Sequence, residues 1–265
     1  MNHCLVVAWH NPVVRDAFCK AWRITGDEPW VVLQQDPGWK SCARTKNAGI
    51  EEAMRRGAEI ITILDDDCLP YGATATIESF MADHEQALEP QPVELFQTIT
   101  TPRSRGTPHL PENRTLTMPV AASMSFWRHV PDFDAPSQLA HGATHAMHYN
   151  RGTIHGRYFA MSGMALSFRA SWWPICQFID IARYDDIAQG LIWQKIAFAK
   201  GYCFSVGLAQ DIWHSRQSNV WSNLRDEVKH MEQFETLWRD IHAYPSNDYE
   251  ALRGLLPVPN GKDHA

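Results

Sequence analysis

Three consecutive aspartates, Asp65, Asp66 and Asp67, are the strongest chemical signal in the sequence. They follow the apolar run at residues 60–64, which is typical of a buried parallel strand. Ligands of open α/β sheets bind at the carboxyl ends of such strands. Side chains alternate along a strand, so Asp65 and Asp67 would point one way and Asp66 the other. Two converging carboxylates need a cation. The pattern therefore indicates a divalent metal that carries a phosphorylated substrate, with an acidic turn or helix cap as the alternative.

A second pair of adjacent carboxylates, Asp185 and Asp186, precedes a predicted amphipathic helix. These aspartates either cap the helix and stabilise its first turn through the dipole, or they bring a second carboxylate pair to the cleft. Gly163 lies in an apolar stretch near the expected site, where a glycine would permit close approach of the backbone to a ligand.

Basic residues gather at the start of a predicted helix over residues 43–56, namely Lys40, Arg44 and Lys46. A basic cluster at a helix N-terminus beside the third strand could hold phosphate oxygens. An ordinary solvated first turn explains the same residues. The sequence contains neither G-x-G-x-x-G nor a Walker A pattern, so dinucleotide and P-loop sites are not supported.

Predicted strands and helices alternate along the chain. This order would bring the aspartates and basic residues to the same edge of one parallel sheet. Strands are predicted at residues 4–9, 30–33, 60–64, 93–99 and 202–206. Helices are predicted at residues 12–22, 43–56, 74–88, 187–200 and 223–241. The first helix would bury Val13, Ala17, Phe18 and Ala21. The last helix carries one apolar face, made of Leu224, Val228, Met231, Trp238 and Ile241. Residues 101–119 and 212–215 are expected to be loops. Alternation of this kind with short links is typical of a parallel α/β unit.

The composition fits one large α/β domain, since the 265 residues are 45% hydrophobic and 20% charged. The net charge of −6 gives no general basic face for nucleic acid. Six cysteines lie scattered without a C-x-x-C pair, which indicates reduced thiols in a cytoplasmic protein. No signal peptide opens the chain, and no apolar run approaches the ~20 residues of a membrane span.

Five motifs, taken in order, resemble the reversibly glycosylated polypeptides, whose plant members are UDP-arabinopyranose mutases. The motifs are ILDDDC at 63–68, VPDFDAPSQL at 130–139, MSGMALSF at 161–168, RYDDI at 183–187 and IWHSRQSN at 212–219. The family is similar to nucleotide-sugar transferases of the GT-A fold. The resemblance therefore implies a GT-A-like α/β fold, a mostly parallel mixed sheet flanked by helices. It further implies one domain over residues 1–255, with a Rossmann-like nucleotide-sugar-binding half at 1–100 and an acceptor half at 101–255. A flexible tail would follow at 256–265.

The resemblance also implies roles for the site residues. Asp65 and Asp67 would form a D-x-D pair that binds Mn²⁺ or Mg²⁺ and, through the ion, the diphosphate of a UDP-sugar. His214 would complete this metal site, and one imidazole among oxygens suits Mn²⁺ better than Mg²⁺. Asp185 or Asp186 would take the proton of an acceptor hydroxyl, as a general base.

The leading hypothesis is a metal-dependent glycosyltransferase that uses a UDP-sugar. The alternative is a UDP-arabinopyranose mutase, and a third reading is a sugar-nucleotide-binding protein with little catalysis. The acceptor stays open among protein, glycan, small molecule and modified DNA base, and so does oligomer formation. One departure weighs against the mutase. Plant members carry a glycosylated arginine where counting back from Trp127 gives Thr115, with Arg114 one place away.

Overall fold

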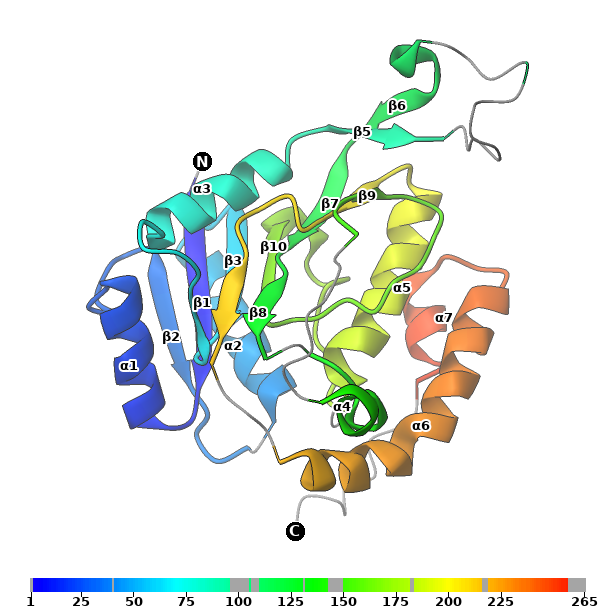
Figure 1. The fold of residues 1–265 in the computed structure, drawn as a ribbon. Coiled ribbons are helices and arrows are strands. Elements are labelled where there is room, and N and C mark those ends of the chain that lie inside the picture. The colour runs from blue at the N-terminus through cyan, green and yellow to red at the C-terminus, as the bar shows by residue number, and fades with distance from the viewer. Residues whose placement is uncertain are drawn as a thin grey trace.

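A seven-stranded mixed sheet forms the centre of the fold in a computed structural model of the chain (Figure 1). The structure describes residues 2–39, 41–95, 105, 110–130, 132–142, 150–181, 184–215 and 219–256. In sheet order, the strands are β2 (Val31–Gln35), β1 (His3–Trp9), β3 (Ile60–Asp65), β10 (Ala165–Arg169), β7 (Val120–Met124), β11 (Cys203–Val206) and β9 (Gly152–Ile154).

The strand directions confirm the GT-A-like class predicted from the sequence. Strands β2, β1 and β3 are parallel, and so are β7 and β11. Strand β10 runs antiparallel between β3 and β7, and β9 is antiparallel at the edge. The flanking helices are α1 (Pro12–Trp22), α2 (Cys42–Arg55), α3 (Ile77–Ala87), α4 (Ala135–His141), α5 (Asp185–Ala199), α6 (Val220–Ala243) and α7 (Tyr249–Arg253).

Local sequence explains where the first elements begin. The Asn11 side chain accepts a hydrogen bond from the Val13 amide, and Pro12 occupies the first turn, so α1 starts where the sequence predicts. Its buried face differs from the prediction, because α1 buries Phe18 and Trp22 and leaves Val13 74% exposed. The Trp22 indole donates to the Cys68 carbonyl, and this contact turns the C-terminal part of the helix toward the sheet.

Two small sheets complete the fold. The first has the order β4 (Cys68–Pro70), β12 (Ile212–His214), β8 (Trp127–His129), and the second pairs β5 (Gln91–Glu94) with β6 (Thr115–Met118). Two loop predictions are therefore wrong, at residues 212–214 and 115–118. Each strand is too short to show a period of two, and each forms because it pairs with a distant strand. Residues 96–104, 106–109 and 257–265 lie outside the described ranges, and with them much of the predicted loop, the end of the predicted strand at 93–99 and most of the predicted tail.

None of the helices in the described ranges combines the length and the apolar composition that crossing a membrane requires.

Candidate functional site

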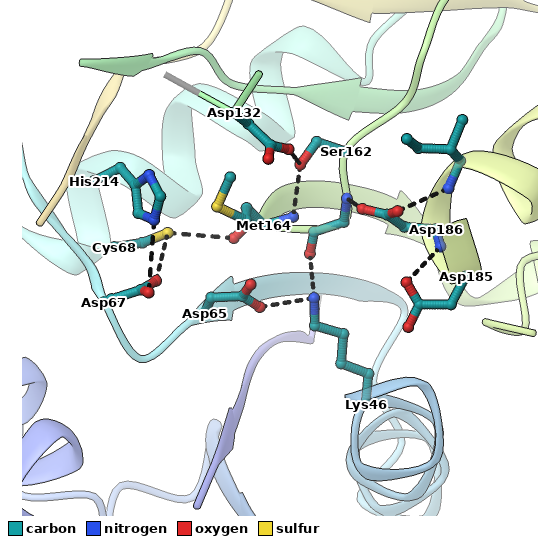
Figure 2. A network of polar contacts seen from close by, with 12 residues as sticks. Lys46, Asp65, Asp67, Cys68, Asp132, Ser162, Met164, Asp185, Asp186 and His214 are labelled. Atoms are coloured by element: carbon teal, nitrogen blue, oxygen red, sulfur yellow. Dashed lines mark hydrogen bonds and ion pairs between the residues drawn. The ribbon is translucent and has the colours of Figure 1, made fainter. Parts of the chain in front are cut away.

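The carboxyl end of β3 opens into a cavity of about 330 Å³. Strand β3, the turn between β3 and β4, Met164 just before β10, helices α2, α4, α5 and α6, and strand β12 all contribute to its wall. Figure 2 shows the polar side chains that converge there. The acidic residues of the lining are Asp65, Asp67, Asp132, Asp134, Asp185, Asp186 and Glu227. Lysine and histidine each occur once in the lining, as Lys46 and His214.

Lys46 and Asp65 form the buried ion pair at the floor of the site. The Lys46 Nζ lies 2.7 Å from Asp65 Oδ1 and donates to the Gly163 carbonyl at 3.0 Å. Burial alone would lower the pKa of Lys46, but the surrounding carboxylates, Asp65 first, raise that pKa well above its usual value. Burial raises the pKa of Asp65, and the Lys46 charge opposes this rise. The ammonium therefore stays charged and holds the Asp65 carboxylate toward α2.

Asp67 and His214 form a second pair on the other side of the cavity. The His214 Nε2 lies 3.5 Å from Asp67 Oδ2, and the His214 Nδ1 donates to the Val130 carbonyl at 2.8 Å. Because a carbonyl only accepts, Nδ1 carries a proton, and Nε2 is the ring nitrogen that faces Asp67. Burial lowers the pKa of His214, but its hydrogen bond and charge interaction with Asp67 outweigh burial and raise the pKa overall.

The structure separates the roles of Asp185 and Asp186. One oxygen of Asp186 accepts from the Gly163 amide at 2.7 Å, and the other accepts from the Ile187 amide at 2.8 Å. Asp185 accepts from the Asp186 amide through Oδ1. Burial, and then the charge of Asp186, raise the pKa of Asp185 to about 7. Asp186 thus fastens α5 to the backbone beside β10, while Asp185 is the carboxyl group with the properties of a base near neutral pH.

Asp132 was not singled out from the sequence, although its motif was. Its Oδ2 accepts from the Ser162 hydroxyl at 3.1 Å (Figure 2). Although the Asp132 residue is exposed at the rim, desolvation of its carboxyl group in the cavity, and then the Asp186 charge, raise the pKa of Asp132 to about 6. Lys46 was noted only as part of a basic cluster. Residue type could not distinguish these two from other surface charges, because their positions depend on contacts between distant segments.

The other predicted site residues lie around the cavity rather than in its wall. Asp66 is buried and does not belong to the lining. Arg44 pairs with Asp180 at 2.7 Å. A Cβ on Gly163 would lie 2.5 Å from the Phe178 ring and 3.1 Å from Asp186 Cβ, so a glycine is needed there for packing. Lys40 lies outside the described residues.

A groove of about 500 Å³ adjoins this cavity, and Cys42 borders both. The groove lies at the carboxyl ends of β1 and β2, and its lining includes Trp9, His10 and Asp36. Its size falls within the ~300–1,000 Å³ of small-molecule sites. Together the two spaces could hold an elongated ligand with one end in the groove and the other in the acidic cavity.

The predicted three-ligand metal site is assembled only in part. No three acidic, histidine or cysteine side chains form a ready-made metal group among the described residues. Asp67 and His214 do fit one ion, because two ligands that are each ~2.1 Å from a metal lie about 3.0–3.5 Å apart. The backbone carbonyl on His214 Nδ1 is the second-sphere partner that metal-bound histidines usually have. Asp65 instead faces Lys46.

Arg114 and Thr115 lie far from the cavity. Both belong to the segment that leads into and forms β6, and Arg114 approaches Glu94 at 3.8 Å. Val93 and Met118 of this ribbon pack with Ile60, the first residue of β3, whereas the cavity begins at Asp65, the last residue. Figure 1 shows the β5–β6 ribbon projecting at the end of the sheet opposite α4.

Comparison with known proteins agrees with the resemblance of the motifs. The family described as "Reversibly glycosylated polypeptide" matches residues 53–243. A probable UDP-arabinopyranose mutase 1 of Pisum sativum is 31% identical over 186 residues, which are 64% of this chain and 50% of that protein. UDP-arabinopyranose mutase 3 of Arabidopsis thaliana is 30% identical over 187 residues, which are 63% of this chain and 50% of that protein. The aligned part is thus about half the length of these curated relatives.

Proposed function

Because the chain belongs to the reversibly glycosylated polypeptide family, we propose that it binds a UDP-sugar in the two adjoining spaces and acts as a UDP-sugar mutase. The names of its relatives carry this proposal, since they favour the mutase over the glycosyltransferase. The acidic lining supports a diphosphate ligand only if a cation accompanies it, because seven carboxyl groups would repel bare phosphate oxygens.

In this proposal the uridine lies in the groove beside Trp9 and His10, and the diphosphate reaches past Cys42 into the acidic cavity. Asp67 and His214 would hold Mn²⁺ or Mg²⁺, and phosphate oxygens would complete the coordination, as is common for ions bound with nucleotides. The ion would supply Lewis-acid stabilisation of the departing UDP.

The remaining groups act on the sugar. Asp185 has a carboxyl pKa near neutrality and would hold or take a proton at a sugar hydroxyl. Asp132, held in place by the Ser162 hydroxyl, would accept a hydrogen bond from a second sugar hydroxyl. Lys46 keeps Asp65 in place and adds the positive charge nearest to the diphosphate. Substrate and product of a mutase are isomers, so no co-reactant is required.

A metal-dependent glycosyltransferase is the second candidate, and one observation favours it. Arg114 and Thr115 lie at the opposite end of the sheet from the cavity, so neither position offers an arginine to the sugar. A transferase needs no such residue, because an external acceptor takes the sugar. The acceptor would then be a protein, glycan, small molecule or modified DNA base.

Incubation of the purified protein with UDP-arabinopyranose and Mn²⁺, followed by chromatography of the nucleotide sugars, tests the proposal. The mutase predicts a UDP-sugar of changed ring form and no net release of UDP. Asp67→Asn should lose this activity, and Arg114→Ala should keep it. Sugar transfer to an added acceptor with release of UDP would support the transferase instead. Tight UDP-sugar binding without either product would indicate a binding protein, and absence of binding would overturn both enzyme assignments.

A further inference from the structure

Helix α6 turns a different face to the molecule than its apolar pattern predicts. The residues that it buries are Asn223, Glu227, Leu237 and Ile241. The predicted apolar residues Leu224 and Val228 follow Asn223 and Glu227 by one position, which rotates them by about 100° around the helix. The first three of the five predicted apolar residues therefore point away from the core, and only Ile241 at the C-terminal end is fully buried.

The side chains left at the surface form a regular stripe. Trp221 is 63% exposed, Val228 58% and Met231 38%, and Leu224 is partly exposed between them. Their spacing of three, four and three residues is that of the a and d positions of a coiled coil. Isolated exposed apolar residues need no explanation, but four in a heptad pattern on one helix form a contiguous surface that a partner helix could cover. Figure 1 shows α6 at the outer edge of the fold, beside α4.

The charges beside the stripe are complementary to those of a second copy of the same helix. Arg225 and Glu232 occupy equivalent positions, each one residue after a d position, on the same flank of the stripe. In an antiparallel pair of α6 helices that places Trp221 opposite Met231 of the partner subunit, Arg225 faces Glu232 of the partner subunit. The same contact repeats through the two-fold axis, so the surface is complementary to itself. Within the described residues, neither Arg225 nor Glu232 forms an ion pair inside its own chain.

We propose that two copies of this chain associate as an antiparallel dimer through the stripe Trp221, Leu224, Val228 and Met231 of α6. Four apolar side chains from each copy bury less than the ~800 Å² per partner of a standard stable interface. The dimer is therefore expected to be weak and concentration-dependent. Helix α6 also borders the acidic cavity, because Glu227 lines it and accepts a hydrogen bond from the Ala135 amide at the start of α4. The dimer would thus hold one wall of the site in each subunit.

Sedimentation velocity of the full chain over a concentration series tests this dimer. The wild-type protein should pass from its 30.2 kDa monomer to twice that mass. Val228→Glu should raise the dissociation constant at least about tenfold, because it places a charge in the centre of the stripe. Val13→Glu, at an exposed apolar residue of α1, is the matched control and should leave association unchanged. Circular dichroism should show equal helix content in all variants.

A charge reversal tests the antiparallel arrangement. Arg225→Glu and Glu232→Arg should each weaken the dimer several-fold, because each places like charges opposite one another. The double variant restores opposite charges and should recover wild-type association. A protein that stays monomeric at every concentration, or a dimer that tolerates Val228→Glu, would overturn the proposal. A dimer whose single charge variants are not rescued by the double variant would overturn it as well.

Discussion

The ammonium of Lys46 lies 2.7 Å from Asp65 Oδ1 and 3.0 Å from the Gly163 carbonyl, so one buried charge joins α2, the end of β3 and the segment before β10. The same glycine donates its amide to Asp186 at the start of α5. Three elements that are distant in the sequence therefore depend on one lysine. The geometry predicts that Lys46 contributes to stability as well as to charge in the cavity.

Replacing Lys46 with Met should lower the free energy of unfolding by about 2–3 kcal/mol, because it leaves the Asp65 carboxylate without its cation. This loss is smaller than the ~3–5 kcal/mol of a fully buried ion pair, because a quarter of the Asp65 side chain is exposed. Urea unfolding measures the change. Lys46→Met combined with Asp65→Asn should recover part of the loss, and Lys20→Met, at an exposed lysine of α1, should have little effect. Additive losses in the double variant would contradict the pairing.

Removal of either proposed metal ligand should weaken Mn²⁺ binding. Asp67→Asn should raise the dissociation constant of Mn²⁺ in the presence of UDP by about 10- to 100-fold, and His214→Gln should act in the same direction. Isothermal titration calorimetry gives both values. Asp16→Asn, at an exposed carboxylate of α1, is the control. Unchanged affinity in the Asp67 variant would remove this residue from the metal site.

Replacing Asp185 and Asp186 with asparagine should have different effects on turnover and stability. Asp185→Asn should reduce turnover by about 10²-fold with UDP affinity unchanged, because a general base is lost. Asp186→Asn should mainly lower stability, by about 1–2 kcal/mol, because a charged acceptor of the Gly163 amide is replaced. Steady-state kinetics and thermal unfolding separate the two effects. If both variants keep full turnover, neither aspartate is the base.

The pH profile of turnover offers a second test of Asp185. Its pKa is raised to about 7, and a base acts only when it is deprotonated. Activity should therefore rise with pH, reach half its maximum near pH 7 and level off about one pH unit higher, and Asp185→Asn should abolish the rise. A profile that is flat between about pH 6 and about pH 8 would contradict this assignment.

A buried histidine should make the fold sensitive to acid. His84 is fully buried, and its ring nitrogens lie 2.9 Å from the hydroxyls of Ser123 and Ser125. Burial, and then the charge of His3, lower the pKa of His84 from 6.5 to about 3. The unfolded chain therefore binds the proton first. The stability contributed by the neutral ring is complete above pH 6.5 and is lost as the pH falls toward 3.

The expected loss from His84 is about 2 kcal/mol between about pH 7 and about pH 5. His84→Gln cannot be protonated in this range, so its stability should fall less steeply with acid than that of the wild type. Urea unfolding at several pH values measures the difference. Parallel pH profiles of the two proteins would show that His84 does not cause the effect.

The sequence predicted those parts of the fold that have strong local signals. The buried strand before Asp65 and the cap at Asn11 are local features, and both appear where expected. Strand β12 was predicted as a loop because three residues show no periodicity, and its pairing with β4 and β8 involves residues far away in the sequence. For α6 the apolar pattern gave the helix correctly but not its orientation, since packing against the rest of the molecule decides which face is buried.

The candidate site shows the same difference between local signals and contacts of distant segments. Residue type and order selected Asp65, Asp67 and Asp185, and the family resemblance added His214; all four line one cavity. Which of them face each other could not be read from the sequence. The pairing of Asp65 with Lys46 depends on how α2 packs against β3, and the anchoring role of Asp186 depends on the approach of α5 to Gly163.

The pairing of β4 with β12 fixes the order in which the site can assemble during synthesis. His214 lies in register with Cys68, and Ser215 donates its amide and its hydroxyl to the Asp67 carbonyl. A ribosome that has made only the first half of the chain has produced Asp65 and Asp67 but not the strand that fastens them. Asp67 and His214 can therefore come together only after residue 215 has left the exit tunnel.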